Sequence, residues 1–214
     1  MPNPKQPLKY YPVPVLIILV IIILLFKVFI ESLLKKEFTV DFQLVFSFLG
    51  SGSLITLLIT LINKYGISLS MVRRKMHLPD LNGRYEGNLI SSFKDELNYP
   101  VKKKCALEIV QDLTGFKVFG YFGELYESGF TSKSESSINN IDEVENGCFT
   151  LMYLYHNTAE PGQEKLFYNN HSGTAVLQYN PIDKSLTGYY YNYDRKSSGS
   201  FQLQFKSKLL THKL

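Results

Sequence analysis

Two long apolar stretches near the N-terminus constrain the fold of this chain more than any other feature. Every residue from Val13 to Phe26 is apolar or proline, the run resumes after Lys27, and residues 42–62 form a second stretch without a formal charge. A helix needs about 20 predominantly apolar residues to cross a hydrocarbon core about 30 Å thick. We therefore predict a hairpin of two transmembrane helices, at about residues 13–30 and 42–62. A cleaved signal peptide is the alternative for the first stretch, but no small-residue cleavage site follows it.

Basic residues around these stretches predict the orientation of the hairpin. Six of them lie before the first helix or after the second, against two in the linker between the helices. They are Lys5, Lys9, Lys64, Arg73, Arg74 and Lys75 outside the hairpin, and Lys35 and Lys36 in the linker. Because loops rich in Lys and Arg stay in the cytoplasm, we expect both termini there. Residues 1–75 then form the hairpin with its basic collar, and residues 76–214 form a cytoplasmic domain.

The second apolar stretch carries small residues at helical spacing. Gly52, Thr56 and Thr60 recur every four residues and would share one face of a helix. Small residues at this spacing let helices approach closely in lipid. The face would pack either on the first helix of the same chain or on helices of other copies.

The charge balance differs between the two parts of the chain. Residues 1–75 hold nine Lys and Arg against three Asp and Glu, whereas residues 76–214 hold fourteen against sixteen. A protein that binds duplex DNA or RNA carries its basic excess on the folded domain, so we expect neither as a partner. The two cysteines, Cys105 and Cys148, are expected to be free thiols in a reducing compartment, with a disulfide as the alternative.

The C-terminal part alternates apolar and polar residues between turn residues, which is typical of strands. We predict eight strands, at about residues 83–92, 101–112, 115–123, 130–138, 148–156, 171–179, 184–193 and 198–208. Short connections predict an antiparallel meander, and eight strands suffice to close a barrel around side chains or one small ligand. Glycines inside the strands favour an eight-stranded, up-and-down, all-β barrel over a sandwich, because they mark bends and close backbone approach. They are Gly83, Gly87, Gly120, Gly173, Gly188 and Gly199.

The motifs of common enzymes are missing from the sequence. It has no GxSxG, HExxH, P-loop or GxGxxG pattern and no metal-ligand spacing. His171 and Ser172 adjoin, but neighbours on a strand point to opposite faces. We expect no enzyme activity, no cofactor and no metal.

The order of motifs resembles a known family, the two-transmembrane β-barrel effectors of cyclic-oligonucleotide-based antiphage signalling (CBASS). Those motifs are residues 81–87 (LNGRYEG), 107–111 (LEIVQ), the serine-rich 128–137, 171–177 (HSGTAVL), 186–195 (LTGYYYNYDR) and Gly199. One departure is Tyr85, where such proteins often carry Trp, but the aromatic ring is retained.

The resemblance implies a receptor-effector of the bacterial inner membrane. Its barrel would bind a cyclic dinucleotide, form a homo-oligomer and disrupt the membrane lipids, which kills the infected cell. Matched to these motifs and to an interior position, the expected ligand-binding residues are Tyr85, Gln111, Tyr153, Thr174, Tyr191 and Arg195. Tyr85 and Tyr191 would stack on or hydrogen-bond the bases, Gln111 and Thr174 would bind base or ribose edges, and Arg195 would bind a phosphate.

Two other functions fit the same sequence. The Gly83–Tyr85 opening also resembles the start of lipocalin-type barrels, which bind apolar small molecules. A membrane-anchored scaffold that docks a partner through its strands is the third.

Overall fold

The computed structural model describes residues 59–213 except 95–96, 127–128, 145–146, 162–169 and 195, together with nine single residues between 21 and 57. The chain divides into two compact units. One comprises Met1–Leu78 with Asp112–Thr114, and the other comprises Pro79–Gln111 with Gly115–Leu214.

The described part of the first unit is helical. Residues 59–66 are helical, and α4 (Ser70–Met76) follows after a short turn. The last turn of α4 carries three basic residues, which suits the negative end of a helix dipole, and His77 ends it in the left-handed region. Ile67, Met76 and Leu113 form a small apolar core in this unit.

The two predicted transmembrane helices lie largely outside the described residues. Among the residues that are described, no helix combines the length and the apolar character that crossing a membrane requires. Gly52 also lies outside them, whereas Thr56 and Thr60 are helical and exposed. The Thr60 hydroxyl donates a hydrogen bond to the Thr56 carbonyl at 2.7 Å.

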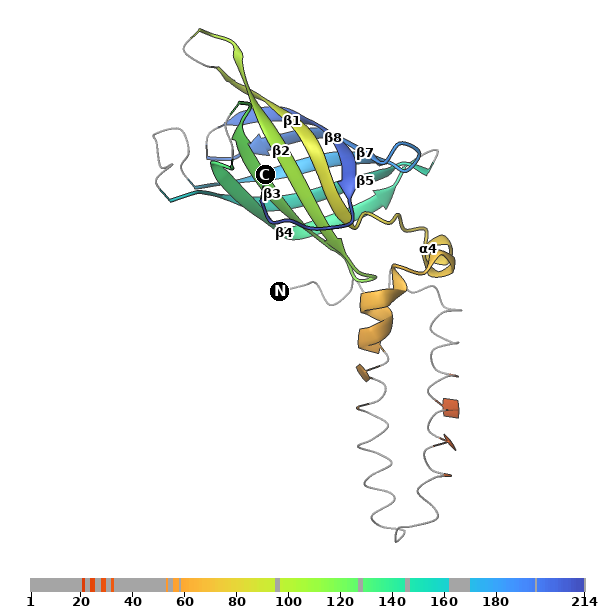
Figure 1. Ribbon diagram of the computed structural model, residues 1–214. Coiled ribbons are helices and arrows are strands. Elements are labelled where there is room, and N and C mark those ends of the chain that lie inside the picture. Colours follow the sequence, from red (N-terminus) through yellow and green to blue (C-terminus); the bar gives the residue numbers. More distant parts are fainter. Residues whose placement is uncertain are drawn as a thin grey trace. The chain divides into compact units, whose positions relative to one another are not determined.

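The second unit is a closed eight-stranded antiparallel barrel, as predicted (Figure 1). Each strand pairs with its neighbours in sequence, and β1 pairs with β8 to close the sheet. The strands are β1 (Gly83–Lys94), β2 (Pro100–Gln111), β3 (Phe116–Glu124), β4 (Ser132–Glu143), β5 (Phe149–Ala159), β6 (His171–Asn180), β7 (Ser185–Asn192) and β8 (Ser197–Ser207).

One strand departs clearly from the sequence prediction. β4 runs five residues beyond the predicted end at residue 138, and its register against β5 shifts between Ser136 and Ile138. Its backbone pairing with β3 covers only four residue pairs. Past them, side chains connect the two strands: Ser136 Oγ accepts the Val118 N–H at 2.8 Å, and Asn139 Nδ2 donates to the Phe116 carbonyl.

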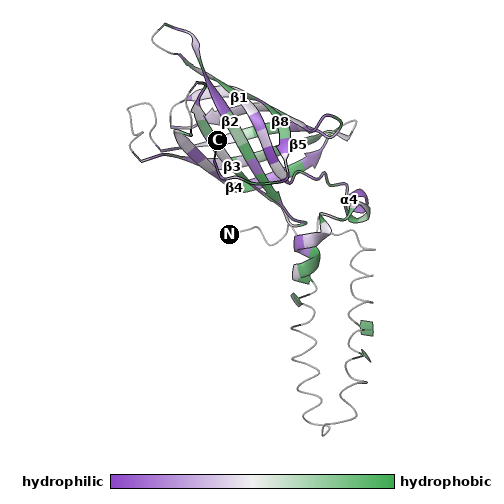
Figure 2. Cartoon of the chain, in the orientation of Figure 1, coloured by the Kyte–Doolittle hydropathy of each residue, from purple (hydrophilic) through white to green (hydrophobic). Residues whose placement is uncertain are grey.

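Alternation along the strands separates the interior from the outer wall. Cys105, Leu107 and Ile109 alternate along β2 and are all buried on its inner face. Figure 2 shows hydrophobic and hydrophilic residues following one another along the strands. Cys105 is buried, Cys148 is half-buried, and both are free thiols, so the disulfide alternative is wrong.

Glycines lie where two strands approach too closely for a side chain. A Cβ added at Gly188 would collide with the backbone carbonyl of Val176 on β6, and one added at Gly173 would collide with the Tyr155 hydroxyl. The strand glycines therefore permit close backbone contact and leave room for large rings, as expected of a small barrel.

Replacing Gly188 with alanine should lower stability by about 1–3 kcal/mol, because the backbone of β6 must move to admit the methyl group. Thermal unfolding followed by circular dichroism measures the loss. Gly115→Ala is the matched control, since its nearest neighbour would be the Asn139 side-chain oxygen at 3.1 Å. Equal melting temperatures for the two variants would contradict the close strand approach.

Candidate functional site

The barrel interior changes from apolar to polar along its axis. We call the end of the barrel where β1 begins at Gly83 the linker end, after residues 79–82, which lead into β1. The opposite end, where β1 finishes, is the far end. Cross-strand neighbours near the linker end are large and apolar or aromatic. Two inward rows there are Ile141, Leu151, Leu177, Gly188 and Phe201, and then Phe149, Tyr179, Leu186 and Leu203.

Toward the far end the inward residues become polar. Starting at the far end, three inward rows are Ser134, Asn157 and His171; then Ser136, Tyr155, Gly173, Asn192 and Ser197; then Asn139, Tyr153, Ala175, Tyr190 and Gly199. We call these three rows the polar half of the interior. Burying so many polar groups costs free energy unless they find partners in the protein or in a ligand.

A chain of hydrogen bonds crosses the polar half from β5 to β8. The Tyr155 hydroxyl donates to Asn192 Oδ1, and Asn192 Nδ2 donates to Ser197 Oγ at 2.9 Å. Gly173 lies directly beside the Tyr155 hydroxyl, so the glycine makes room for this ring. The chain fixes the Asn192 amide with its oxygen toward Tyr155 and its nitrogen toward Ser197.

Two buried polar side chains in the polar half remain without such partners. Ser134 on β4 and Asn157 on β5 are cross-strand neighbours with 8% and 4% exposure, and within the described part of the chain neither side chain has a hydrogen bond. Ser136, one position on, is already engaged by the Val118 N–H. The hydroxyl and the amide of this pair are therefore available to a bound molecule.

Aromatic rings surround this pair and its neighbours. Tyr153 and Tyr155 meet edge to face with their centroids 6.4 Å apart, and Tyr155 meets His171 in the same way at 6.3 Å. Burial raises the pKa of the Tyr153 hydroxyl well above its ordinary value, with smaller contributions from Cys105 and Tyr155, so it remains a neutral phenol. Neutral tyrosines can both stack on and hydrogen-bond a planar base.

The three rows of the polar half include no carboxylate. Lys103 on β2 and Glu124 on β3 pair across the strands at 3.1 Å, and alternation points both side chains inward, with Lys103 beside Leu89. The arrangement offers hydroxyls, amides, aromatic rings, an imidazole and a lysine whose charge is balanced by a glutamate. These groups can bind a planar, polar molecule, and Lys103 can bind an anion that replaces Glu124.

The family assignment agrees with this chemistry. The family model described as Cap15, cyclic dinucleotide receptor domain, matches residues 76–205 of the 214-residue chain. The chain belongs to this family. The match confirms the predicted family and covers the barrel except for the last two residues of β8. A search of the curated proteins finds no match to the chain.

Three of the residues predicted for ligand binding in this Cap15-family chain point into the barrel. Tyr153 lies in the polar half, but Tyr85 and Gln111 lie at the linker end. The Tyr85 hydroxyl donates to the Leu81 carbonyl at 3.1 Å, and Gln111 Oε1 accepts the Leu81 N–H at 2.8 Å. Both side chains therefore bind Leu81 and close the linker end of the barrel. Because they are engaged there, we define the candidate site without them.

The predicted interior position is wrong for Thr174 and Tyr191. The two residues are cross-strand neighbours on the outer wall, and Tyr191 is 44% exposed. Tyr189, Tyr191 and Tyr193 are exposed, whereas Tyr190 and Asn192 are buried and form the inward set. Arg195 lies outside the described residues.

Sequence reasoning missed most of the polar half. Tyr155 and Asn192 were visible from alternation alone, because they share a face with Tyr153 and Tyr190 respectively. Ser134 and Asn157 gave no comparable signal, since each lies in a stretch of polar residues whose inner face sequence cannot identify.

The one close Ser–His pair in the described part of the chain lies outside this region. His156 Nδ1 lies 3.0 Å from Ser172 Oγ on the outer wall, whereas His171 points inward. Asp194 Oδ2 accepts the Ser172 backbone N–H at 3.0 Å.

We expect the two thiols of this Cap15-family chain to differ sharply in reactivity. Burial raises the pKa of the Cys105 thiol well above its ordinary value. At about pH 8, where thiols are usually labelled, this thiol therefore stays protonated and shielded. Ellman's reagent should titrate Cys148 quickly in the native protein and both thiols after denaturation. Two fast thiols in the native state would contradict the position of Cys105 inside the barrel.

Proposed function

We propose that the polar half of the interior binds a cyclic dinucleotide and that the chain is a CBASS receptor-effector without enzyme activity of its own. The observation that supports the site best is the Ser134–Asn157 pair, whose largely buried side chains have no hydrogen-bond partner among the described residues, in a barrel of a cyclic dinucleotide receptor family. A ligand would supply those partners.

Each part of a cyclic dinucleotide matches a group of the described barrel. The bases would meet the tyrosine rings and the Asn157 amide, and the phosphates would meet Lys103 and His171. Arg195 would bind a phosphate as well, as the family resemblance implies. Because the domain as a whole has no basic excess, binding depends on individually placed groups rather than on a broad positive field.

The effector step that we propose takes place at a bacterial inner membrane. Support comes from the two apolar stretches, whose described residues are helical and expose apolar side chains, including Leu24 at 55% and Leu25 at 66%. Ligand binding would promote homo-oligomerisation, bring hairpins of several copies together and disrupt the lipid bilayer. The small-residue face with Gly52, Thr56 and Thr60 would let these helices pack closely.

A cyclic dinucleotide should raise the melting temperature of the purified chain. At a ligand concentration 100 times the Kd, binding to the folded state alone contributes about 2.7 kcal/mol, which corresponds to a shift of several degrees. Differential scanning fluorimetry with a panel of cyclic dinucleotides and fatty acids measures the shift. A shift with fatty acids alone would instead identify a lipocalin-type barrel.

Two variants and a matched control sharpen this test. Tyr155→Phe removes the hydroxyl that orients Asn192 and should weaken the nucleotide shift, whereas Tyr191→Phe removes an outward hydroxyl and should leave it unchanged. Arg195→Ala should abolish the shift and keep the unliganded melting temperature. A large loss of unliganded stability in Arg195→Ala would make that residue structural.

Deleting residues 1–75 should separate binding from killing. The remaining barrel should keep its nucleotide shift, because the proposed site lies within β2 and β4–β8, and Arg195 also belongs to the retained residues. Expression of the truncated chain with the activating nucleotide should no longer arrest growth, while the full chain at matched expression should. If the truncated barrel still killed cells, the membrane mechanism would be wrong.

A further inference from the structure

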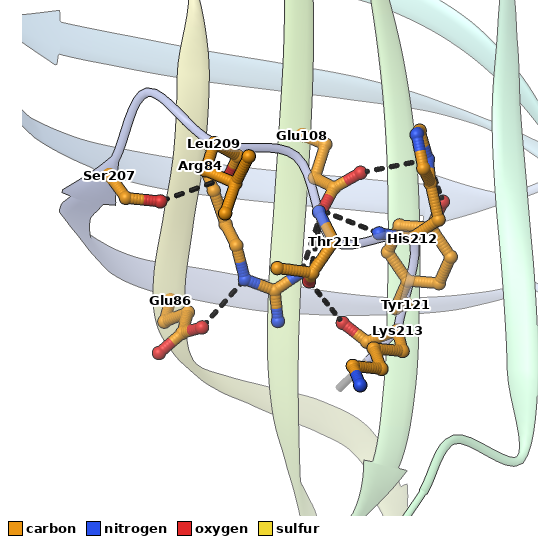
Figure 3. Close-up of polar contacts among 9 residues, drawn as sticks. All are labelled: Arg84, Glu86, Glu108, Tyr121, Ser207, Leu209, Thr211, His212 and Lys213. Atoms are coloured by element: carbon orange, nitrogen blue, oxygen red, sulfur yellow. Dashed lines mark hydrogen bonds and ion pairs between the residues drawn. The ribbon is translucent and has the colours of Figure 1, made fainter.

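A strap formed by residues 208–213 crosses the outer wall of the barrel over β1, β2 and β3 (Figure 3). It follows the last residue of β8, Ser207, and it belongs to none of the strands. The family match ends at residue 205, so the strap lies beyond the matched domain.

One carboxylate on the wall holds the strap by its backbone. Glu108 Oε1 accepts the N–H groups of Thr211 and His212 at 2.7 and 3.0 Å, and Arg84 Nη1 donates to the same oxygen at 2.8 Å. Binding to two consecutive backbone N–H groups is recognition of a peptide main chain. Glu108 points outward, yet its side chain is fully buried.

The charge of this carboxylate is fixed by its neighbours. Burial by itself would raise the pKa of Glu108, but the N–H of Thr211, the Arg84 guanidinium and the N–H of His212 outweigh it and hold the pKa below its ordinary value. Arg84 is fixed on its other side by Glu86, whose Oε1 accepts Arg84 Nε at 2.6 Å. With the strap in place, the wall therefore presents an oriented, ionised acceptor, and Arg84 is the part of this stabilisation that the strap does not supply.

The second oxygen of Glu108 adds a side-chain requirement. Among the described residues, the group that faces Oε2 is His212 Nδ1, at 3.2 Å, and it donates there only when that nitrogen carries a proton. The same nitrogen lies 3.2 Å from the Tyr121 hydroxyl. The wall thus fits a segment with two backbone donors and a donor side chain on the second residue.

Most of the strap is exposed to solvent. Leu210 is half-buried, whereas the other five residues are exposed, with Leu209 at 71% and the His212 side chain at 66%. When the strap leaves, Glu108 and Arg84 meet water and still pair with each other, so no charge is left isolated in an apolar core. A wall whose charges stay paired beneath a mostly exposed segment suits a replaceable peptide.

We propose that the Arg84–Glu108 wall is a peptide-binding site and that the strap of a second copy replaces the chain's own strap there, linking two barrels. The second copy is the partner because its strap carries the same donors, so exchange remakes every contact at little cost. Lys208 stays anchored to Asp80 at 2.8 Å, and the three to four residues from it to Thr211 and His212 can span about 10–13 Å when extended. That reach suffices between two walls that face each other, and reciprocal exchange closes the dimer.

Two complementary variants test the exchange in the purified full chain without nucleotide. One ends after Ser207 and keeps the wall but lacks the strap, and the other carries Glu108→Ala and keeps the strap but lacks the acceptor. In the second variant Arg84 retains Glu86 as its partner. We expect the mixture to form pairs, measured by energy transfer between labelled chains, at a concentration at least ten times lower than either variant alone.

The control chain carries both changes and reports any association that does not use the strap, including that of the N-terminal stretches. A mixture that associates no better than this control would overturn the proposal, provided that circular dichroism shows both variants folded. If Glu108→Ala does not fold, Glu108→Leu takes its place, because leucine is close to glutamate in size and has no acceptor.

A labelled peptide of residues 207–214 provides an independent measurement. It should bind the chain that ends after Ser207, and a His212→Ala peptide should bind at least ten times more weakly. Peptide binding without pairing in the mixture would overturn the exchange, and no peptide binding would overturn the site itself. Because nucleotide is absent throughout, these outcomes are separate from those of the proposed ligand site.

Discussion

The pairing of β1 with β8 is the constraint on which the rest of the domain depends. It joins segments more than 100 residues apart, with Tyr85 opposite Phe205 and Leu89 opposite Phe201. Closure removes both edges of the sheet and turns one face of every strand into a shared interior. Without it, the same alternation would leave a flat apolar face exposed to water.

The closed interior then divides into two halves with different energetics. The linker end is held by burial of large apolar and aromatic side chains, with Tyr85 packed edge-on against Tyr179 and Phe205. The far end gives up some of that stabilisation for polar groups, part of which satisfy one another through Tyr155 and Asn192. A barrel that is stable at one end can carry under-satisfied polar groups at the other, which is where a ligand gains the most.

The outer wall is stabilised by other interactions than the interior, namely an ion pair and hydrogen bonds to the strap. Glu108 lies in one of the motifs that carry the family resemblance, and its position there is explained by the wall rather than by the ligand. The opposite part of the wall, around Tyr189 and Tyr191, is exposed and is not covered by the strap. The two sides of one sheet thus serve separate purposes, because successive residues point to opposite faces.

Sequence by itself determined the number of strands, most of their boundaries, the closed antiparallel barrel and the division of each strand into two sets of side chains. Tertiary structure alone decided which set points inward. A period of two gives two equivalent faces, so Tyr191 and Tyr190 were equally good candidates until closure of the barrel placed Tyr190 inside. In β4 the register shift between Ser136 and Ile138 also changes which residues face inward. Tertiary structure also decided the extension of β4 past residue 138, because pairing with β5 overrides the low strand propensity of Asn and Asp. It likewise decided the burial of Glu108, which is covered by a strap more than 100 residues later in the sequence.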